Sequence, residues 1–139
     1  MPGYSGTPLV KKLGIKEGSR AALVGAPLGF RNELEGLPTG VSFVTSVEGG
    51  LDFILFFAKT RAELMGNFSR LSAKLNPTGM LWIAWPKKAS GVATDLTDAV
   101  VREVGLNAGL VDVKVCAVNE IWSGLKFVIR VKDRPKVPR

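Results

Sequence analysis

Residues 52–84 read DFILFFAKTRAELMGNFSRLSAKLNPTGMLWIA, and this stretch decides the fold. It begins with a nearly continuous apolar run over 52–58, with the length and the aromatic and branched residues of a buried strand. A second run of the same kind covers 80–84, and a segment with helical spacing lies between the two. Because the connections are short, the stretch predicts a right-handed strand–helix–strand crossover in a parallel sheet.

The helical segment carries its own start and stop signals. Thr60 and Glu63 have capping-box spacing, in which the Thr60 hydroxyl accepts the Glu63 N–H and the Glu63 carboxylate accepts the Thr60 N–H. The motif NPTG at 76–79 predicts the end of the helix. Four large apolar residues recur at spacings of four, three and four, which makes one face apolar: Leu64, Phe68, Leu71 and Leu75.

Weaker patterns extend outward from this unit. Asp95 is the expected N-cap of a second long helix, and residues 122–124 are the expected turn of a terminal hairpin. Apolar or alternating runs predict strands over 20–24, 41–44, 111–118 and 125–131, and amphipathic patterns predict helical turns over 9–14 and 32–37. The residues expected in the core are Leu23, Ile54, Phe56, Leu71, Leu81, Ile83, Val100 and Val115.

Length and composition limit the chemistry. The chain has 139 residues, of which 46% are hydrophobic, so it suits one compact domain. It has no histidine, which excludes Ser-His-Asp and Cys-His nucleophile systems and His-ligated metal sites. Its single cysteine, Cys116, excludes an internal disulfide and is expected to be a packed, inert thiol. We therefore predict no catalytic residue, no metal ligand and no cofactor.

The chain is basic, with a formal net charge of +7. Part of the excess lies in the tail over 132–139, which has four basic residues and one acidic residue. This tail is either a solvated terminus or a contact for nucleic acid or an anionic membrane surface. The longest apolar run, over 51–58, is far shorter than the ~20 residues that span a bilayer. With no signal pattern at the N-terminus, the sequence predicts a cytoplasmic protein without a membrane contact.

Ligands of an open parallel sheet usually bind beyond the carboxyl ends of its strands. Three lysines at those predicted ends would favour a phosphate, carboxylate or phosphodiester, unless they are only solvated. Two tryptophans there would line a pocket, stack a base or anchor a partner, unless they only pack against their own loops. The hypothetical ligand-binding residues are Lys59, Trp85, Lys87, Lys88, Glu120 and Trp122.

The loop after the first predicted strand, VGAPLGF at 24–30, differs from a dinucleotide fingerprint. That fingerprint needs its second glycine where Pro27 stands, and Pro27 lacks the N–H that a phosphate-binding loop uses. No Walker pattern occurs in the chain.

The order of elements around LNPTGMLWI at 75–83, followed by a terminal hairpin, resembles the second half of a class I methyltransferase-like Rossmann fold. In that family a glycine-rich loop follows the first strand, and an acidic residue ends the second strand and holds the cofactor ribose. Here those places hold Gly25-Ala26-Pro27 and Val44-Thr45-Ser46.

A second resemblance covers nearly the whole chain. The stretches GYSGTPL at 3–9, WPKKAS at 85–90, VKVCAV at 113–118 and WSGLKF at 122–127 are similar to a family of small uncharacterised bacterial proteins. This resemblance implies a bacterial protein and brings no activity with it.

Together these patterns predict one α/β domain over 1–139, with its core at about 9–131. We expect a three-layer, Rossmann-like, mostly parallel sheet of about six strands in the order 2-1-3-4-6-5. The sixth strand must be antiparallel because its connection is too short for a crossover, and the methyltransferase resemblance places it between the fourth and fifth.

The first functional interpretation is a non-catalytic module that binds an anionic small molecule, a protein partner or a second copy at the carboxyl edge. The alternatives are a degenerate methyltransferase-like enzyme and a basic adaptor for nucleic acid or protein. Nucleic acid is the less favoured partner, because a body charge of about +4 is a weak electrostatic footprint.

Overall fold

A computed structural model describes residues 7–45 and 48–134. Its strands are β1 (Arg20–Val24), β2 (Ser42–Phe43), β3 (Leu51–Phe57), β4 (Leu75–Pro86), β5 (Leu110–Ala117) and β6 (Trp122–Ile129). Its helices are α1 (Leu9–Leu13), α2 (Arg61–Ser72) and α3 (Asp98–Asn107), with 3-10 turns η1 (Phe30–Glu33), η2 (Lys88–Ser90) and η3 (Val131–Asp133). Part of the predicted basic tail (135–139) and part of the GYSGTPL stretch (3–6) lie outside the described residues.

The described strands form one six-stranded sheet in the order β2-β1-β3-β4-β6-β5. Strands β2, β1, β3 and β4 pair in parallel, and β6 is antiparallel to both β4 and β5. The predicted strand order and the antiparallel last strand are therefore confirmed.

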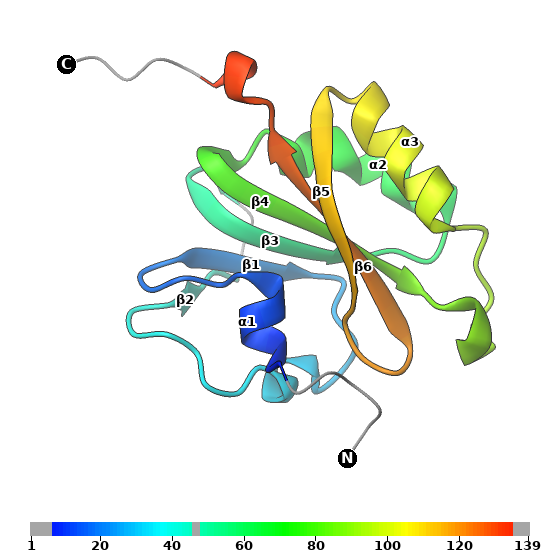
Figure 1. Cartoon of the computed structure of the whole chain (residues 1–139), viewed down its shortest axis with the longest axis horizontal. Coiled ribbons are helices and arrows are strands. Elements are labelled where there is room, and N and C mark those ends of the chain that lie inside the picture. Colours follow the sequence, from blue (N-terminus) through cyan, green and yellow to red (C-terminus); the bar gives the residue numbers. More distant parts are fainter. Residues whose placement is uncertain (1–6, 46–47, 135–139) are drawn as a thin grey trace.

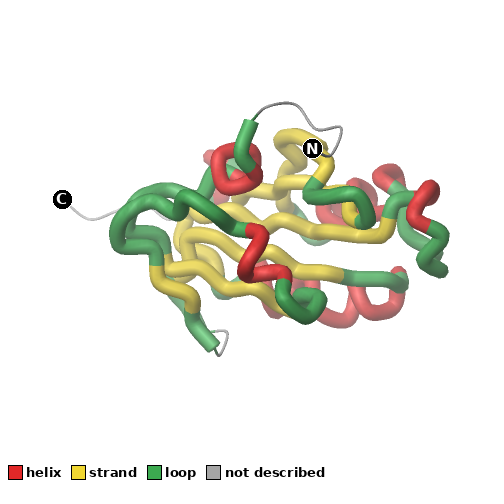
Figure 2. Tube along the Cα trace, turned by 90° about the horizontal axis from the view of Figure 1, so that it is seen from below, coloured by secondary structure: helices red, strands yellow, loops and turns green. Residues whose placement is uncertain are grey.

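Helical segments cover both faces of the sheet, and each face has its own apolar core (Figures 1 and 2). One core joins α2 and α3 to the sheet through side chains such as Phe68, Val101 and Phe127. The other joins α1 and η1 to the opposite face around Trp82, whose indole Nε1 donates to the Leu13 carbonyl at 2.8 Å. The three-layer prediction is confirmed.

The predicted start of α2 is confirmed, with one shift. The Glu63 N–H donates to the Thr60 hydroxyl oxygen at 3.0 Å. The Glu63 carboxylate accepts the N–H of Lys59 at 2.8 Å, instead of that of Thr60. Two orphan donors at the start of the helix are satisfied in either case, so the local stabilisation is that of a capping box.

Four local predictions are wrong. Thr97, not Asp95, caps α3, because its hydroxyl accepts the Val100 N–H at 3.2 Å. The NPTG segment lies inside the twelve-residue β4 instead of forming a loop before it. The helix expected over 32–37 is only the 3-10 turn η1. Trp122 already begins β6, and the turn precedes it, where the Asn119 side chain accepts the Trp122 N–H at 2.9 Å.

The predicted core needs one correction at the edge of the sheet. Val115 is 47% exposed, because β5 is the last strand of the sheet and its register shifts between Asp112 and Lys114. Leu23 and Val100 are half-buried, and the other five expected core residues are buried. No helix in 7–45 or 48–134 combines the length and apolar character that a membrane span requires.

Candidate functional site

Two adjoining cavities open at the carboxyl edge of the sheet. The smaller, of about 440 Å³, lies over the ends of β1 and β3 and is lined by Gly25, Pro27, Phe57, Lys59, Glu63, Val92, Ile121 and Trp122. The larger, of about 650 Å³, lies beyond β4 and under the loop that leads to α3. Val92 lines both. Cavities of this size are typical of small-molecule sites.

The exit of β1 needs a glycine for two reasons. Gly25 has φ +68°, a left-handed conformation that side chains disfavour. A Cβ added to Gly25 would also lie 3.0 Å from the Phe57 carbonyl oxygen. This close approach brings the ends of β1 and β3 together under the smaller cavity. Pro27 follows at the rim.

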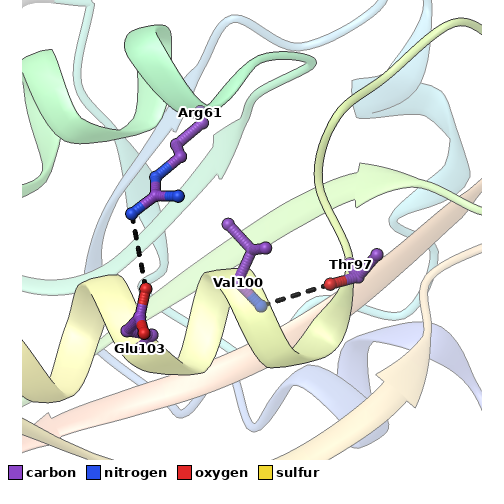
Figure 3. A network of polar contacts seen from close by, with 4 residues as sticks. All are labelled: Arg61, Thr97, Val100 and Glu103. Atoms are coloured by element: carbon purple, nitrogen blue, oxygen red, sulfur yellow. Dashed lines mark hydrogen bonds and ion pairs between the residues drawn. The ribbon is translucent and has the colours of Figure 1, made fainter.

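Hydrogen bonds tie the loop before α3 to the end of β3. The Thr94 hydroxyl donates to the Lys59 carbonyl at 2.6 Å, and Asp95 accepts the Arg61 N–H at 2.7 Å. The Arg61 guanidinium also reaches Glu103 of α3 at 3.4 Å, and Figure 3 shows this ion pair together with the Thr97 cap at the start of that helix. Asp95 therefore caps α2, the neighbouring helix, and the bond from Thr94 to Lys59 joins a residue of the larger cavity to one of the smaller.

The two tryptophans at the site are walls and not exposed platforms. Trp85 is 5% exposed and belongs to the core beneath α2 and α3. Trp122 is 6% exposed and meets Phe57 edge to face, with 5.0 Å between the ring centroids. Burial on this scale leaves little of either indole for stacking on a base.

The charged residues of the site are divided between the cavities. Lys59 and Glu63 line the smaller cavity, and Lys87, Lys88 and Asp98 line the larger. Lys88 is exposed, whereas Lys87 is only half exposed, and its N–H donates to the Ile121 carbonyl at 2.7 Å. Glu120 is exposed and lines neither of these cavities. Five of the six proposed site residues thus line one or the other of these adjoining cavities, and their role in binding stays a prediction.

Sequence reasoning misses several residues of this site. The spacing of Glu63 indicates only a capping role, and no pattern singles out Val92, Thr94 or Ile121. The rule that places Lys59 at the carboxyl edge also places the first turn of the following helix there, and hence Glu63. Nothing in the local sequence indicates that the loop around Val92 folds back over the end of β3.

No protein-family model matches the chain, and no curated protein sequence matches it. Solved structures do. A SAM-dependent methyltransferase from Aquifex aeolicus is 17% identical, with a TM-score of 0.62 and 88% of each chain covered. Magnesium protoporphyrin IX methyltransferase from Synechocystis, solved with bound SAM, is 14% identical, with a TM-score of 0.56, 88% of this chain and 74% of that chain covered. The chain has a class I methyltransferase-like Rossmann fold.

A protein from Bordetella parapertussis, described as a possible exported protein, has a TM-score of 0.64 at 12% identity. The match covers 88% of this chain but only 65% of that one, so the chain spans less than two thirds of that protein. At such identities the methyltransferase-like likeness is one of fold.

The comparisons overturn the first functional interpretation. A non-catalytic binding module is contradicted, because the solved neighbours include SAM-dependent methyltransferases, one of them with SAM bound. The alternative of a methyltransferase-like enzyme is better supported. That interpretation rested on the lysines and tryptophans at the predicted strand ends and on the absence of a nucleophile–base pair, whereas the whole topology is of the methyltransferase type.

Proposed function

We propose that this chain is a methyltransferase-like protein whose smaller cavity holds S-adenosylmethionine. The observation that carries the proposal is the position of this cavity, over the ends of β1 and β3, with a lysine and a glutamate in its wall. In an open α/β sheet, ligands bind beyond the carboxyl ends of the strands, where the strand order reverses. The order β2-β1-β3 places that reversal at this cavity.

The chemistry of the lining residues suits the cofactor. Phe57, Val92 and Trp122 supply apolar walls for an adenine ring. The Lys59 ammonium would pair with the carboxylate of the methionine moiety. Glu63 accepts the Lys59 N–H through Oε1, and its remaining acceptor capacity suits the ribose hydroxyls. This glutamate on α2 would thus replace the acidic residue that the resembling family carries at the end of its second strand, where this chain has Val44 and Thr45.

When bound, S-adenosylmethionine supplies an electrophilic methyl group. The larger cavity would hold the acceptor, since the two cavities meet at Val92. Lys87 and Lys88 outnumber Asp98 in the lining of this cavity, and the net positive charge favours an acceptor with a carboxylate or phosphate group. The buried Trp85 forms its apolar floor and excludes water from that side.

Isothermal titration calorimetry with S-adenosylmethionine and S-adenosylhomocysteine tests the proposal. We expect binding in the micromolar range for the wild-type chain. Lys59→Ala should weaken it at least about tenfold, which corresponds to about 1.4 kcal/mol for one charge-assisted contact. Ile121→Trp should abolish it, because Ile121 lies in the cavity wall and the larger ring would fill the space.

Val131→Trp is the matched control. Val131 is 76% exposed on η3 and lines neither cavity, so the same new side chain there should leave binding unchanged. Absence of heat and of thermal stabilisation with either ligand at millimolar concentration would refute the proposal. Equal loss of binding in both tryptophan variants would show that the measured site is elsewhere.

A further inference from the structure

Two lysines stand directly opposite each other on neighbouring antiparallel strands. In the register of β5 and β6, Lys114 is the partner of Lys126. Directly opposed side chains lie on the same face of the sheet, and like charges in such a pair destabilise it. The ion pairs Arg61–Glu103 and Arg102–Asp112 include neither lysine. Within the described part of the chain, the fold therefore holds these two close cations without an acidic partner.

Two further lysines, on α1 and in the loop that follows it, lie near this pair. Lys126 is also the partner of Trp82 in β4, so its side chain lies on the face that α1 covers. A Cβ added to Gly14, at the end of α1, would lie 3.9 Å from the Lys126 Nζ. Lys12 on α1 and Lys16 in the loop that follows therefore flank the pair. We call Lys12, Lys16, Lys114 and Lys126 the lysine patch.

The charges of the patch act on two groups. The pKa of Lys126 is lowered, first by partial burial and then by the charges of Lys114 and Lys16. Lys12 and Lys114 act on the Cys116 thiol beside them in the direction that favours its thiolate. A bound anion would relieve this repulsion.

The patch lies at the end of α1, next to the part of the sheet that this helix leaves uncovered. Figure 1 shows α1 in front of the sheet, with β5 and β6 uncovered beside it, whereas α2 and α3 lie on the opposite face. Lys114 is exposed, and Lys126 is partly exposed. The patch is also separate from the two cavities, because none of its four lysines lines either of them. It is consequently a distinct surface, independent of the proposed methyltransferase-like site.

We propose that the lysine patch binds the phosphate backbone of duplex nucleic acid, without reading its base sequence. Several lysines close together match a ligand with closely spaced negative charges, and a duplex carries one charge for each ~1.7 Å of its axis. Lysine is a compact point charge that suits phosphate contacts without fixed geometry. Among the described residues, the exposed large apolar side chains include no aromatic one, so the surface lacks platforms on which unpaired bases would stack.

The test measures the binding of a fluorescently labelled duplex by anisotropy across a series of salt concentrations. For the wild-type chain, log affinity should fall linearly with log salt. The double variant Lys114→Ala/Lys126→Ala should bind more weakly, and its slope should be shallower by up to about 1.8, or about 0.9 for each phosphate that is no longer neutralised. This variant is expected to fold, because it removes a repulsive pair.

Arg70→Ala/Lys74→Ala is the matched control. It removes the same charge from α2 and the residues after it, on the opposite face, and should leave the slope unchanged. An equal fall in both double variants would overturn the proposal, because only net charge would then matter. Preference for phosphatidylserine vesicles or polyglutamate over the duplex would also overturn it, since the partner would then be a membrane or an acidic protein.

Discussion

Gly105 of α3 lies directly against the ring of Phe127 in β6. A Cβ added to Gly105 would lie 2.0 Å from the Phe127 Cε1, which is far inside van der Waals contact. Phe127 is fully buried and also meets Phe68 of α2 edge to face, at 5.3 Å between ring centroids. A glycine inside a helix costs up to about 1 kcal/mol relative to alanine. Here that cost allows α3 to approach the sheet closely enough to bury the ring.

Gly105→Ala should therefore destabilise the protein, although alanine is the better helix former. Overpacking of a filled core typically costs about 1–3 kcal/mol, and the ring cannot move away without disturbing Phe68. Urea unfolding followed by circular dichroism measures the change. Gly66→Ala in α2 is the control, because an added Cβ there meets nothing within 4 Å. It should stabilise by about 0.5–1 kcal/mol. Stabilisation by both variants would contradict this packing.

The contacts between α2 and α3 should differ in strength. Asp95→Ala removes the carboxylate that caps the Arg61 N–H at 2.7 Å, and we expect a loss of about 1 kcal/mol. Glu103→Gln breaks the ion pair with Arg61, in which both side chains are at least half exposed, and should cost less than about 0.5 kcal/mol. Thermal unfolding of the two variants compares them. A larger loss of stability for Glu103→Gln than for Asp95→Ala would contradict the conclusion that the Asp95 cap is the stronger contact.

Burial raises the pKa of the Cys116 thiol, and this effect exceeds the opposing influence of Lys12 and Lys114. Alkylation of the folded protein by iodoacetamide should therefore reach its half-maximal rate at higher pH than alkylation in urea. Since the folded pKa is the higher one, this thiol's contribution to stability is present below the unfolded pKa and is lost as pH rises through the folded pKa. Mass spectrometry follows the alkylation rates.

The same alkylation experiment tests whether the charge of Lys114 acts on the Cys116 thiol. Lys114→Ala removes a positive charge that favours the thiolate, so it should raise the thiol pKa further. Lys74 lies between α2 and β4 and is not among the charges that act on Cys116, so Lys74→Ala should leave the profile unchanged. A lower thiol pKa in Lys114→Ala would contradict the placement of Lys114 beside Cys116.

Truncating Trp82 should lower the free energy of unfolding of the protein more than truncating Trp85. Trp82→Phe removes the indole N–H that donates to the Leu13 carbonyl at 2.8 Å, and the buried carbonyl is then left without this partner. We expect an extra loss of about 1–3 kcal/mol over Trp85→Phe, which makes the same volume change in the opposite core. Denaturant unfolding of both variants measures the difference. Equal losses would mean that the hydrogen bond to α1 contributes nothing net.

Boundary errors in the sequence-based prediction have a common physical origin. Asp95 and Thr97 are both good N-cap residues, and choosing between them depends on Arg61, thirty-four positions away, which uses the Asp95 carboxylate. Likewise NPTG has the composition of a turn, but pairing with β3 and the contacts of Asn76 hold it in β4. The Asn76 amide donates to the Asp52 carboxylate at 2.6 Å. Local chemistry permits several boundaries, and distant partners select one.

Only part of the candidate site could be predicted, because the rest also depends on distant partners. Strand ends are marked by apolar runs that stop, and parallel strands share an edge, so Lys59, Lys87 and Lys88 could be assigned to one region. The burial of Trp85 and Trp122 could not be inferred, because it depends on which side chains meet them from other elements. Phe57 covers Trp122, for example, from sixty-five positions away.

The sequence by itself determined the strand–helix–strand unit over 52–84 and the antiparallel last strand, since hydrophobic periodicity and connection length are local properties. Together with the methyltransferase-like resemblance, it also determined the strand order. Only the tertiary structure decided what lies opposite what: Gly105 against Phe127, Lys114 against Lys126, and Glu63 in the wall of the smaller cavity. Register and close approach depend on the packing of distant segments, and a pattern along one segment carries no information about its partner.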